Sequence, residues 1–231
     1  AAFVDADRGV ADVKAALDGA RHILEERLGE NAELVGRLRG LMADQGKVFS
    51  KVVEEKRAEG AKFSDYFDFA EPLAKVPSHR ALALFRGRAQ GVLDLRLDLE
   101  IPDGEPHPAE RIVAAHAGVK DLGRPADKWL GDVCRWTWKL KIGPHVETDL
   151  MGGLREQAED EAIRVFARNL HDLLLAAPAG PRATIGLDPG IRTGVKVAVI
   201  DATGKLVDTT TVYPHEPRRD WDGSIAVLAA L

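Results

Sequence analysis

The sequence predicts a mainly α-helical chain that is followed by a short antiparallel β-meander and one further helix. Apolar residues recur at intervals of three and four through most of residues 1–177, which is the period of an amphipathic helix. After residue 183, apolar and polar residues alternate in short runs separated by turn residues, which is the pattern of β-strands. Between these two parts, residues 178–182 are rich in proline, glycine and alanine and predict a linker.

Residues 1–46 predict a helical hairpin. The first helix carries an apolar stripe with helical spacing, formed by Val10, Val13, Leu17, Ala20, Leu24 and Leu28. Gly29 breaks this pattern, and Asn31 is a favourable N-cap for a second helix. The second helix carries Leu34, Leu38, Leu41 and Met42 and ends before Gly46.

The segment from residue 47 to residue 99 predicts one helix and one strand. Residues 47–77 have no clear period, although their aromatic residues are suited to packing between helices; these are Phe63, Tyr66, Phe67 and Phe69. Ser78 is a favourable N-cap for a helix that continues through Phe85. Leucines alternate with charged residues over 92–99, which predicts a strand with one buried face. We expect this strand to be the main exception to helix before residue 178.

Helix is predicted again from residue 108 to residue 177. Four apolar residues with helical spacing should share one face, namely Trp129, Val133, Trp136 and Leu140. A single long helix is expected from about His145 to Leu175.

Residues 183–231 predict three consecutive strands and then a helix. Strand-like runs cover 184–188, 194–201 and 206–213, and short turns connect them, so the strands should form an antiparallel meander. A helix begins near Asp220. The order β-β-β-α is how RNase H-like α/β folds open. The expected fold class is therefore a mainly α chain that carries an incomplete RNase H-like domain.

Composition and charge restrict the classes of function. The chain has 32 basic and 37 acidic residues and a net charge of −5, which argues against a wholesale polyanion binder but allows local basic patches. The longest small or apolar stretch, residues 173–180, is far shorter than the ~18 residues that a membrane span needs. A single cysteine, Cys134, fits a reducing compartment, so we expect a cytoplasmic protein with no membrane partner.

The two ends of the sequence indicate a segment of a longer protein. The chain starts without an initiator methionine. Residues 225–231 follow an apolar helical pattern and have no helix stop signal. We therefore expect the remaining parts of the RNase H-like domain to follow residue 231.

Asp188 is the candidate catalytic and metal-binding residue. It lies in the motif of residues 186–194, Gly-Leu-Asp-Pro-Gly-Ile-Arg-Thr-Gly. In RNase H-like nucleases, a first-strand carboxylate helps to hold two magnesium ions that activate the attacking and leaving oxygens. Two alternatives remain open: the motif simply turns the chain, or it is a phosphate loop like that of actin-like ATPases. No cofactor is expected. Magnesium is expected to bind only if carboxylates from later parts of the domain complete the site.

Two basic segments are candidates for nucleic-acid binding. Their arginines and lysines, together with one arginine of the 186–194 motif, form the predicted set: Arg80, Arg86, Arg88, Arg135, Lys139, Lys141 and Arg192. Tryptophans accompany the second segment, residues 129–141, and could stack on single-stranded bases. For the first segment, the alternative is that the arginines lie on a solvated helix face and that Gly87 ends the helix. For the second segment, the alternative is that the tryptophans pack in the core.

Three long motifs, in the same order, resemble the family of the bacterial transcription accessory protein Tex. They are residues 78–88 (Ser-His-Arg-Ala-Leu-Ala-Leu-Phe-Arg-Gly-Arg), 186–201 and 213–221 (Tyr-Pro-His-Glu-Pro-Arg-Arg-Asp-Trp). The resemblance implies an intertwined helical core followed by a YqgF-type RNase H-like domain. It also implies a cytoplasmic protein that binds nucleic acid, RNA especially, and influences transcription. Family members continue into helix-hairpin-helix modules and an OB-fold domain, so their main RNA-binding surface is expected outside this segment.

Three functions follow as hypotheses. The first is a scaffold segment that binds RNA or single-stranded nucleic acid near the transcription machinery and is not catalytic by itself. The second is a magnesium-dependent nuclease or resolvase with Asp188 as its first metal carboxylate. The third is a scaffold that binds only proteins, which would have no salt-dependent affinity for nucleic acid.

Overall fold

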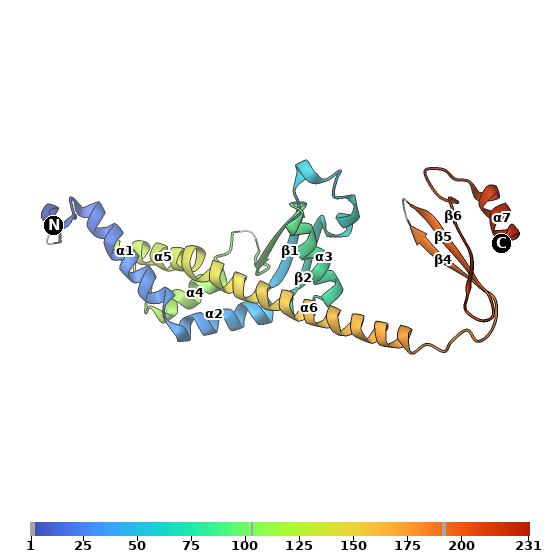
Figure 1. Cartoon of the computed structure of the whole chain (residues 1–231). Coiled ribbons are helices and arrows are strands. Elements are labelled where there is room, and N and C mark those ends of the chain that lie inside the picture. Colours follow the sequence, from blue (N-terminus) through green and yellow to red (C-terminus); the bar gives the residue numbers. More distant parts are fainter. Residues whose placement is uncertain (1–2, 103, 191–192) are drawn as a thin grey trace. The chain divides into compact units, whose positions relative to one another are not determined.

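The computed structural model describes residues 3–102, 104–190 and 193–231 (Figure 1). The chain divides into two compact units, Ala1–Arg168 and Asn169–Leu231. The helices of the first unit are α1 (Val13–Gly29), α2 (Ala32–Gln45), α3 (Ser78–Ala89), α4 (Pro108–His116) and α5 (Pro125–Trp136), and α6 (Gly143–Leu174) begins in it. Its strands are β1 (Lys47–Val52), β2 (Asp68–Pro72) and β3 (Leu93–Asp98).

The predicted helical hairpin is confirmed. The Asn31 side chain accepts a hydrogen bond from the backbone N–H of Leu34 at 2.9 Å, as expected of an N-cap. Helix α2 then buries Leu34, Leu38 and Met42. The apolar stripe of α1 is less well covered, since Val13 is 54% exposed.

The segment without a clear period contains two strands that the sequence did not predict. Strands β2, β1 and β3 form an antiparallel sheet with β1 in the centre, so the strand near residues 92–99 is one of three. Ser50 occupies a buried position of β1 and donates a hydrogen bond to the carbonyl oxygen of Tyr66 at 2.7 Å. A polar residue at this position interrupts the apolar alternation and so conceals the strand.

Helix α3 differs from the prediction at both ends. Pro77 is the N-cap, and Ser78 is the first helical residue. The helix continues to Ala89, past Gly87, which is therefore not a helix stop. Gly87 is buried because α3 packs closely on β3 there: an added Cβ would lie 2.4 Å from Leu93 Cδ1. The glycine permits close packing between a helix and a strand.

A six-residue π-helix, Thr137–Ile142, joins α5 to α6 and corrects the predicted apolar face. The prediction placed Trp136 and Leu140 in the core, but they are 40% and 64% exposed. Trp138 and Ile142 are buried instead. The wider π turn shifts the helical register, so the 3.6-residue period does not hold across it.

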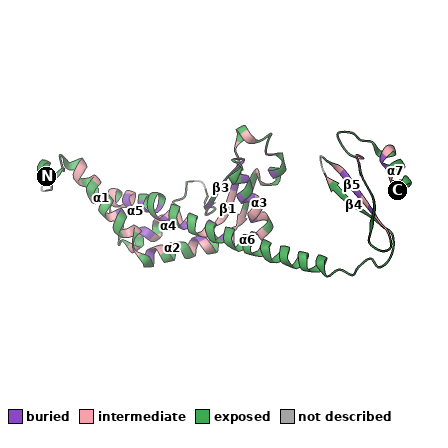
Figure 2. Ribbon diagram, viewed as in Figure 1, coloured by how far each residue is buried: buried purple, intermediate pink, exposed green. Residues whose placement is uncertain are grey.

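The long helix is confirmed as α6, Gly143–Leu174, close to the predicted bounds. Its first half buries Val146, Met151, Leu154 and Ala158. Every residue from 159 to 174 is exposed, as the green colour of this part shows in Figure 2.

The second unit has the predicted β-β-β-α order. Strands β4 (Thr184–Gly190), β5 (Gly194–Ile200) and β6 (Leu206–Val212) form an antiparallel meander, and α7 (Trp221–Ala230) follows. The small core contains Val195, Val197 and Val212, against which Leu228 and Leu231 pack. These are the opening elements of an RNase H-like fold. In the described part of the chain, no helix is both long enough and apolar enough to cross a membrane.

Candidate nucleic-acid interface

Helix α3 presents two arginines to solvent. Arg86 and Arg88 are exposed, and each guanidinium lies over an aromatic ring, Arg86 at 5.5 Å from the centre of Phe63 and Arg88 at 5.1 Å from that of Phe85. These rings support the long side chains from below. Among the described residues, no carboxylate lies within 4.0 Å of either guanidinium. Both cations are therefore available to an anionic ligand.

Lys62 lies near Arg86, although the sequence analysis did not identify it. Its ammonium lies 5.1 Å from the centre of the Phe63 ring, the same ring that supports Arg86. Phe63 is only 1% exposed, so the ring is held firmly by the core. Lys62 is 24 residues before Arg86 in a segment without a clear period, so only the fold brings the two together. We name Lys62, Arg86 and Arg88 the α3 patch.

Arg80, the third predicted cation of this segment, has a structural partner. Its Nη1 donates to Glu71 Oε2 at 2.6 Å, and its guanidinium lies 5.7 Å from the centre of the Phe69 ring. This hydrogen bond to the Glu71 carboxylate raises the pKa of the arginine. Arg80 thus links α3 to β2 and is less available to a ligand than Arg86.

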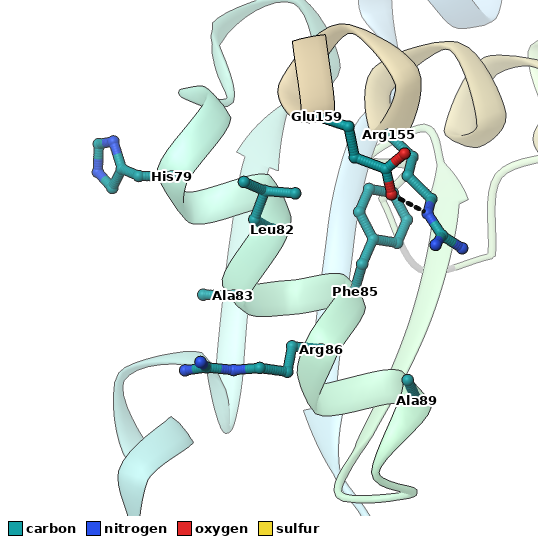
Figure 3. Close-up of a pocket in the computed structure, with 8 residues that line it drawn as sticks. All are labelled: His79, Leu82, Ala83, Phe85, Arg86, Ala89, Arg155 and Glu159. Atoms are coloured by element: carbon teal, nitrogen blue, oxygen red, sulfur yellow. Dashed lines mark hydrogen bonds and ion pairs between the residues drawn. The ribbon is translucent and has the colours of Figure 1, made fainter. Parts of the chain in front are cut away.

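A groove follows the exposed side of α3 and is bordered by α6 (Figure 3). Its volume is about 430 Å³, and it is lined by His79, Leu82, Ala83, Phe85, Arg86, Ala89, Arg155 and Glu159. Figure 3 shows His79 and Arg86 extending from one side of α3, while Arg155 and Glu159 reach down from α6 toward Phe85. The Nε of Arg155 donates to Glu159 Oε1 at 2.7 Å.

The second basic segment is largely neutralised. Arg135 lies 3.1 Å from Asp132 and 3.5 Å from Glu110, and Lys139 lies 3.8 Å from the other oxygen of Glu110. Lys141 is exposed on the π-helix. The fold therefore brings an acidic partner from α4 to two of the three cations, which the sequence pattern could not show.

The tryptophans near this segment are mainly structural. Trp138 is 7% exposed, and its ring lies 5.0 Å from that of His107. Trp136 is half-exposed, but the guanidinium of Arg21 covers its ring at 4.6 Å. The burial of Trp138 indicates that it packs in the core. The ring of Trp136 is covered by the Arg21 guanidinium.

His107 links the loop before α4 to the sheet. Its Nε2 lies 3.1 Å from Asp98 Oδ1, and its Nδ1 accepts a hydrogen bond from the backbone N–H of Ala109 at 3.1 Å. Burial raises the pKa of the Asp98 carboxyl, but hydrogen bonds from His107 and from the Leu99 N–H bring the net pKa below its usual value. Both ring nitrogens of His107 are thus engaged within the protein.

Asp188 is exposed on β4, where its cross-strand partner in the sheet register is Lys196 of β5. Thr211 of β6 is the next residue in the same row. In the described parts of the chain, no three His, Cys, Asp or Glu residues are close enough to hold a metal ion. Asp188 and Lys196 thus lie opposite each other on neighbouring strands.

Asp201, another carboxylate of this unit, holds a turn. It accepts hydrogen bonds from the hydroxyl and the N–H of Thr203, at 2.6 and 2.8 Å, and from the Lys205 N–H at 3.1 Å. These bonds lower the pKa of Asp201. Arg192, the remaining predicted nucleic-acid-binding residue, lies outside the described residues.

The loop between β6 and α7 is tied at both ends. The Asp220 N–H donates to the Tyr213 carbonyl oxygen at 3.0 Å, and the Asp220 side chain caps α7 by accepting from the Gly223 N–H. The guanidinium of Arg218 lies 4.0 Å from the centre of the Tyr213 ring. Tyr213 also packs on Gly194, whose φ of +77° and close contact leave no space for a side chain. The loop and the Asp188 motif therefore meet at one end of the meander.

A helical core that contains a small sheet, followed by the opening meander and helix of an RNase H-like domain, defines the class of this protein. Two family models match this chain. The Tex central region-like model matches residues 1–166, and the Tex protein YqgF-like domain model matches residues 182–231. The chain belongs to the Tex family.

Individual relatives agree with this assignment. The chain is 56% identical to Protein tex of Bordetella pertussis over 100% of its own length and 30% of that relative. It is 50% identical to the transcriptional accessory protein Tex of Neisseria gonorrhoeae over 91% of its length and 28% of that relative. It is 30% identical to the human S1 RNA-binding domain-containing protein 1, over 85% of its length and 20% of that protein. The chain thus spans less than a third of each of these relatives.

Proposed function

We propose that this chain is a non-catalytic scaffold segment of a cytoplasmic transcription accessory protein, and that it binds RNA through phosphate contacts. The names of two relatives support the proposal, since one is a transcriptional accessory protein and another carries an RNA-binding S1 domain. The transcription machinery is the partner that such a name favours.

One observation carries the assignment of the binding surface. Among the predicted cations of the two basic segments, Arg80, Arg135 and Lys139 have acidic partners, whereas Arg86 and Arg88 have none within 4.0 Å in the described structure. Cations that already neutralise a carboxylate gain little from a phosphate, because binding must replace the existing contact. The α3 patch is therefore the surface that phosphates should bind.

Two double variants with the same change in charge test this proposal. Arg86→Gln with Arg88→Gln removes two cations from the α3 patch, and Arg135→Gln with Lys139→Gln removes two neutralised cations. Fluorescence anisotropy with a labelled single-stranded RNA, measured over a range of salt, gives the affinity and its salt slope. The first variant should reduce the slope by roughly one unit per lost contact and weaken binding. The second should change both much less.

The result could contradict the proposal in two ways. Equal losses in both variants would mean that only the overall charge matters. No loss in either would mean that the α3 patch is a solvated face and would favour the scaffold that binds only proteins.

The nuclease alternative, with Asp188 as first metal carboxylate, has weaker support. Asp188, the one metal ligand that this alternative names, lies opposite Lys196 in the sheet register. A cleavage assay separates the two functions and is described in the Discussion.

A further inference from the structure

The groove between α3 and α6 combines an apolar floor with cations, and this combination restricts its ligand. Leu82, Ala83 and Ala89 provide the floor, and Arg86 and Arg155 provide two guanidinium groups (Figure 3). A volume of about 430 Å³ falls within the ~300–1,000 Å³ of typical small-ligand sites. An inorganic anion would leave the apolar floor uncovered, and an apolar side chain would leave the arginines without acceptors.

The two arginines are prepared for different contacts. Glu159 holds the Nε of Arg155 at 2.7 Å, which orients the guanidinium plane and leaves its terminal nitrogens free of any hydrogen bond within the described residues. Bases of single-stranded RNA stack on such guanidinium planes. Arg86 has no carboxylate within 4.0 Å and belongs to the α3 patch, where a phosphate is expected.

We propose that the α3–α6 groove binds one unpaired nucleotide of a single-stranded RNA. The base lies on Leu82 and Ala83 beside the guanidinium of Arg155, and Arg86 donates to the phosphate. This proposal rests on the proposed function, because it assumes that RNA reaches the α3 patch. It adds a selectivity that the patch alone lacks. A duplex offers only its backbone to the groove, so single strands gain a contact that duplexes do not.

The proposal is tested by filling the apolar floor of the groove with larger side chains that leave its charge unchanged. Ala83→Leu with Ala89→Leu places larger side chains at two groove positions of α3, and leucine is nearly as good a helix former as alanine. Affinity is measured by anisotropy for a labelled single-stranded 12-nucleotide RNA and for its duplex. The leucine variant should bind the single strand about fivefold more weakly, the low end of what one stacked base contributes, with an unchanged salt slope. Duplex affinity should not change.

A second pair of variants tests the side of the groove that α6 forms. Arg155→Gln removes the proposed stacking plane, and Arg164→Gln removes an exposed cation of the same helix that does not line the groove. Arg155→Gln should weaken single-strand binding more than its control. An RNA carrying one 2-aminopurine should change its fluorescence on binding to the native chain and much less with the leucine variant.

The outcomes separate the two proposals. If the leucine variant and Arg155→Gln bind single strands like the native chain, while loss of Arg86 and Arg88 weakens single strand and duplex alike, the groove proposal fails and the proposed function stands. If no variant weakens RNA binding, the proposed function fails as well. Competition by an acidic peptide that is as strong as competition by RNA would show that the groove recognises anions in general and would also overturn the proposal.

Discussion

Gly87 shows how one residue sets the packing of the central sheet. It lies inside α3 against Leu93 of β3, and a Cβ at this position would approach Leu93 Cδ1 at 2.4 Å and Cγ at 2.7 Å. Gly87 lets α3 lie close against β3, while the flanking residues Arg86 and Arg88 remain exposed. Packing at this one position therefore helps to hold α3, which carries Arg86 and Arg88, against the sheet.

We predict that Gly87→Ala destabilises the fold by about 1–3 kcal/mol, because the added methyl group overpacks a closed contact. Urea unfolding followed by circular dichroism measures the change. Gly40→Ala is the matched control: Gly40 lies within α2, and a Cβ there meets nothing within 4 Å. The control should be stabilised by roughly 0.5–1 kcal/mol through helix propensity. A loss of stability in both variants would contradict the packing argument.

Asp127 is the most strongly perturbed carboxylate described in this chain. Its side chain is 1% exposed and accepts hydrogen bonds from the Arg124 guanidinium and from the N–H groups of Arg124 and Leu122. The side-chain bond from Arg124, followed by the backbone bonds, lowers the pKa of Asp127 to about 2. The bonds fix the turn that leads into α5.

This shift predicts a pH-dependent contribution to stability. An unfolded aspartate has a pKa of about 3.9, so the folded form binds its proton less readily. The stabilisation is fully present above about pH 4 and is lost as the pH falls toward 2. Asp127→Asn should therefore lower the urea midpoint at pH 7, and the difference from the native chain should shrink below pH 4. A difference that stays constant from pH 7 to pH 2.5 would show that the charge of Asp127 is unimportant.

At the scale of elements, the sequence was informative where a single period extends over many residues. The hairpin of α1 and α2, the long helix α6 and the β4–β6 meander were predicted with bounds close to those observed. Local signals were sufficient there, as for Asn31, which caps α2 as expected. Each of these elements repeats one pattern, so one exception does not obscure it.

Two elements escaped prediction for physical reasons. Strand β1 places Ser50 at a buried position, where a hydrogen bond to Tyr66 replaces apolar contact, so its alternation is broken. The π-helix at residues 137–142 adds a wider turn, which moved Trp136 and Leu140 to the surface and Trp138 into the core. In both cases the tertiary structure overrides a short local pattern.

The same limit applies to the candidate interface. The sequence placed Arg86 and Arg88 near the end of one helix, which is a local property, and α3 carries both residues. It could not show that Glu71 binds Arg80 or that Glu110 reaches Arg135, since these contacts join separate elements. Lys62 and Arg155 were missed for the same reason.

At the scale of the whole molecule, the proposed binding of RNA to an acidic chain requires charges to act locally. The net charge of −5 is spread over 231 residues, and at physiological salt the screening length is only about 8 Å. A phosphate near the α3 patch therefore responds to Lys62, Arg86 and Arg88 more than to the overall charge. This explains why two double variants with equal changes in net charge are expected to differ.

The row of Asp188, Lys196 and Thr211 across the meander leads to the last prediction. We expect that this chain does not cleave RNA, DNA or four-way junctions in magnesium or manganese. Phosphodiester cleavage by two metal ions needs several carboxylates that converge on them, whereas the cross-strand partner of Asp188 is a cation. Asp201 cannot supply a second ligand there, because its side chain is bound to Thr203 and Lys205. Asp188→Asn should change RNA affinity by less than about threefold, because Asp188 is an exposed carboxylate outside the α3 patch. Labelled substrates incubated with the purified chain and resolved on denaturing gels provide the measurement. Cleavage that disappears in the Asp188→Asn variant would establish a nuclease and overturn the non-catalytic scaffold.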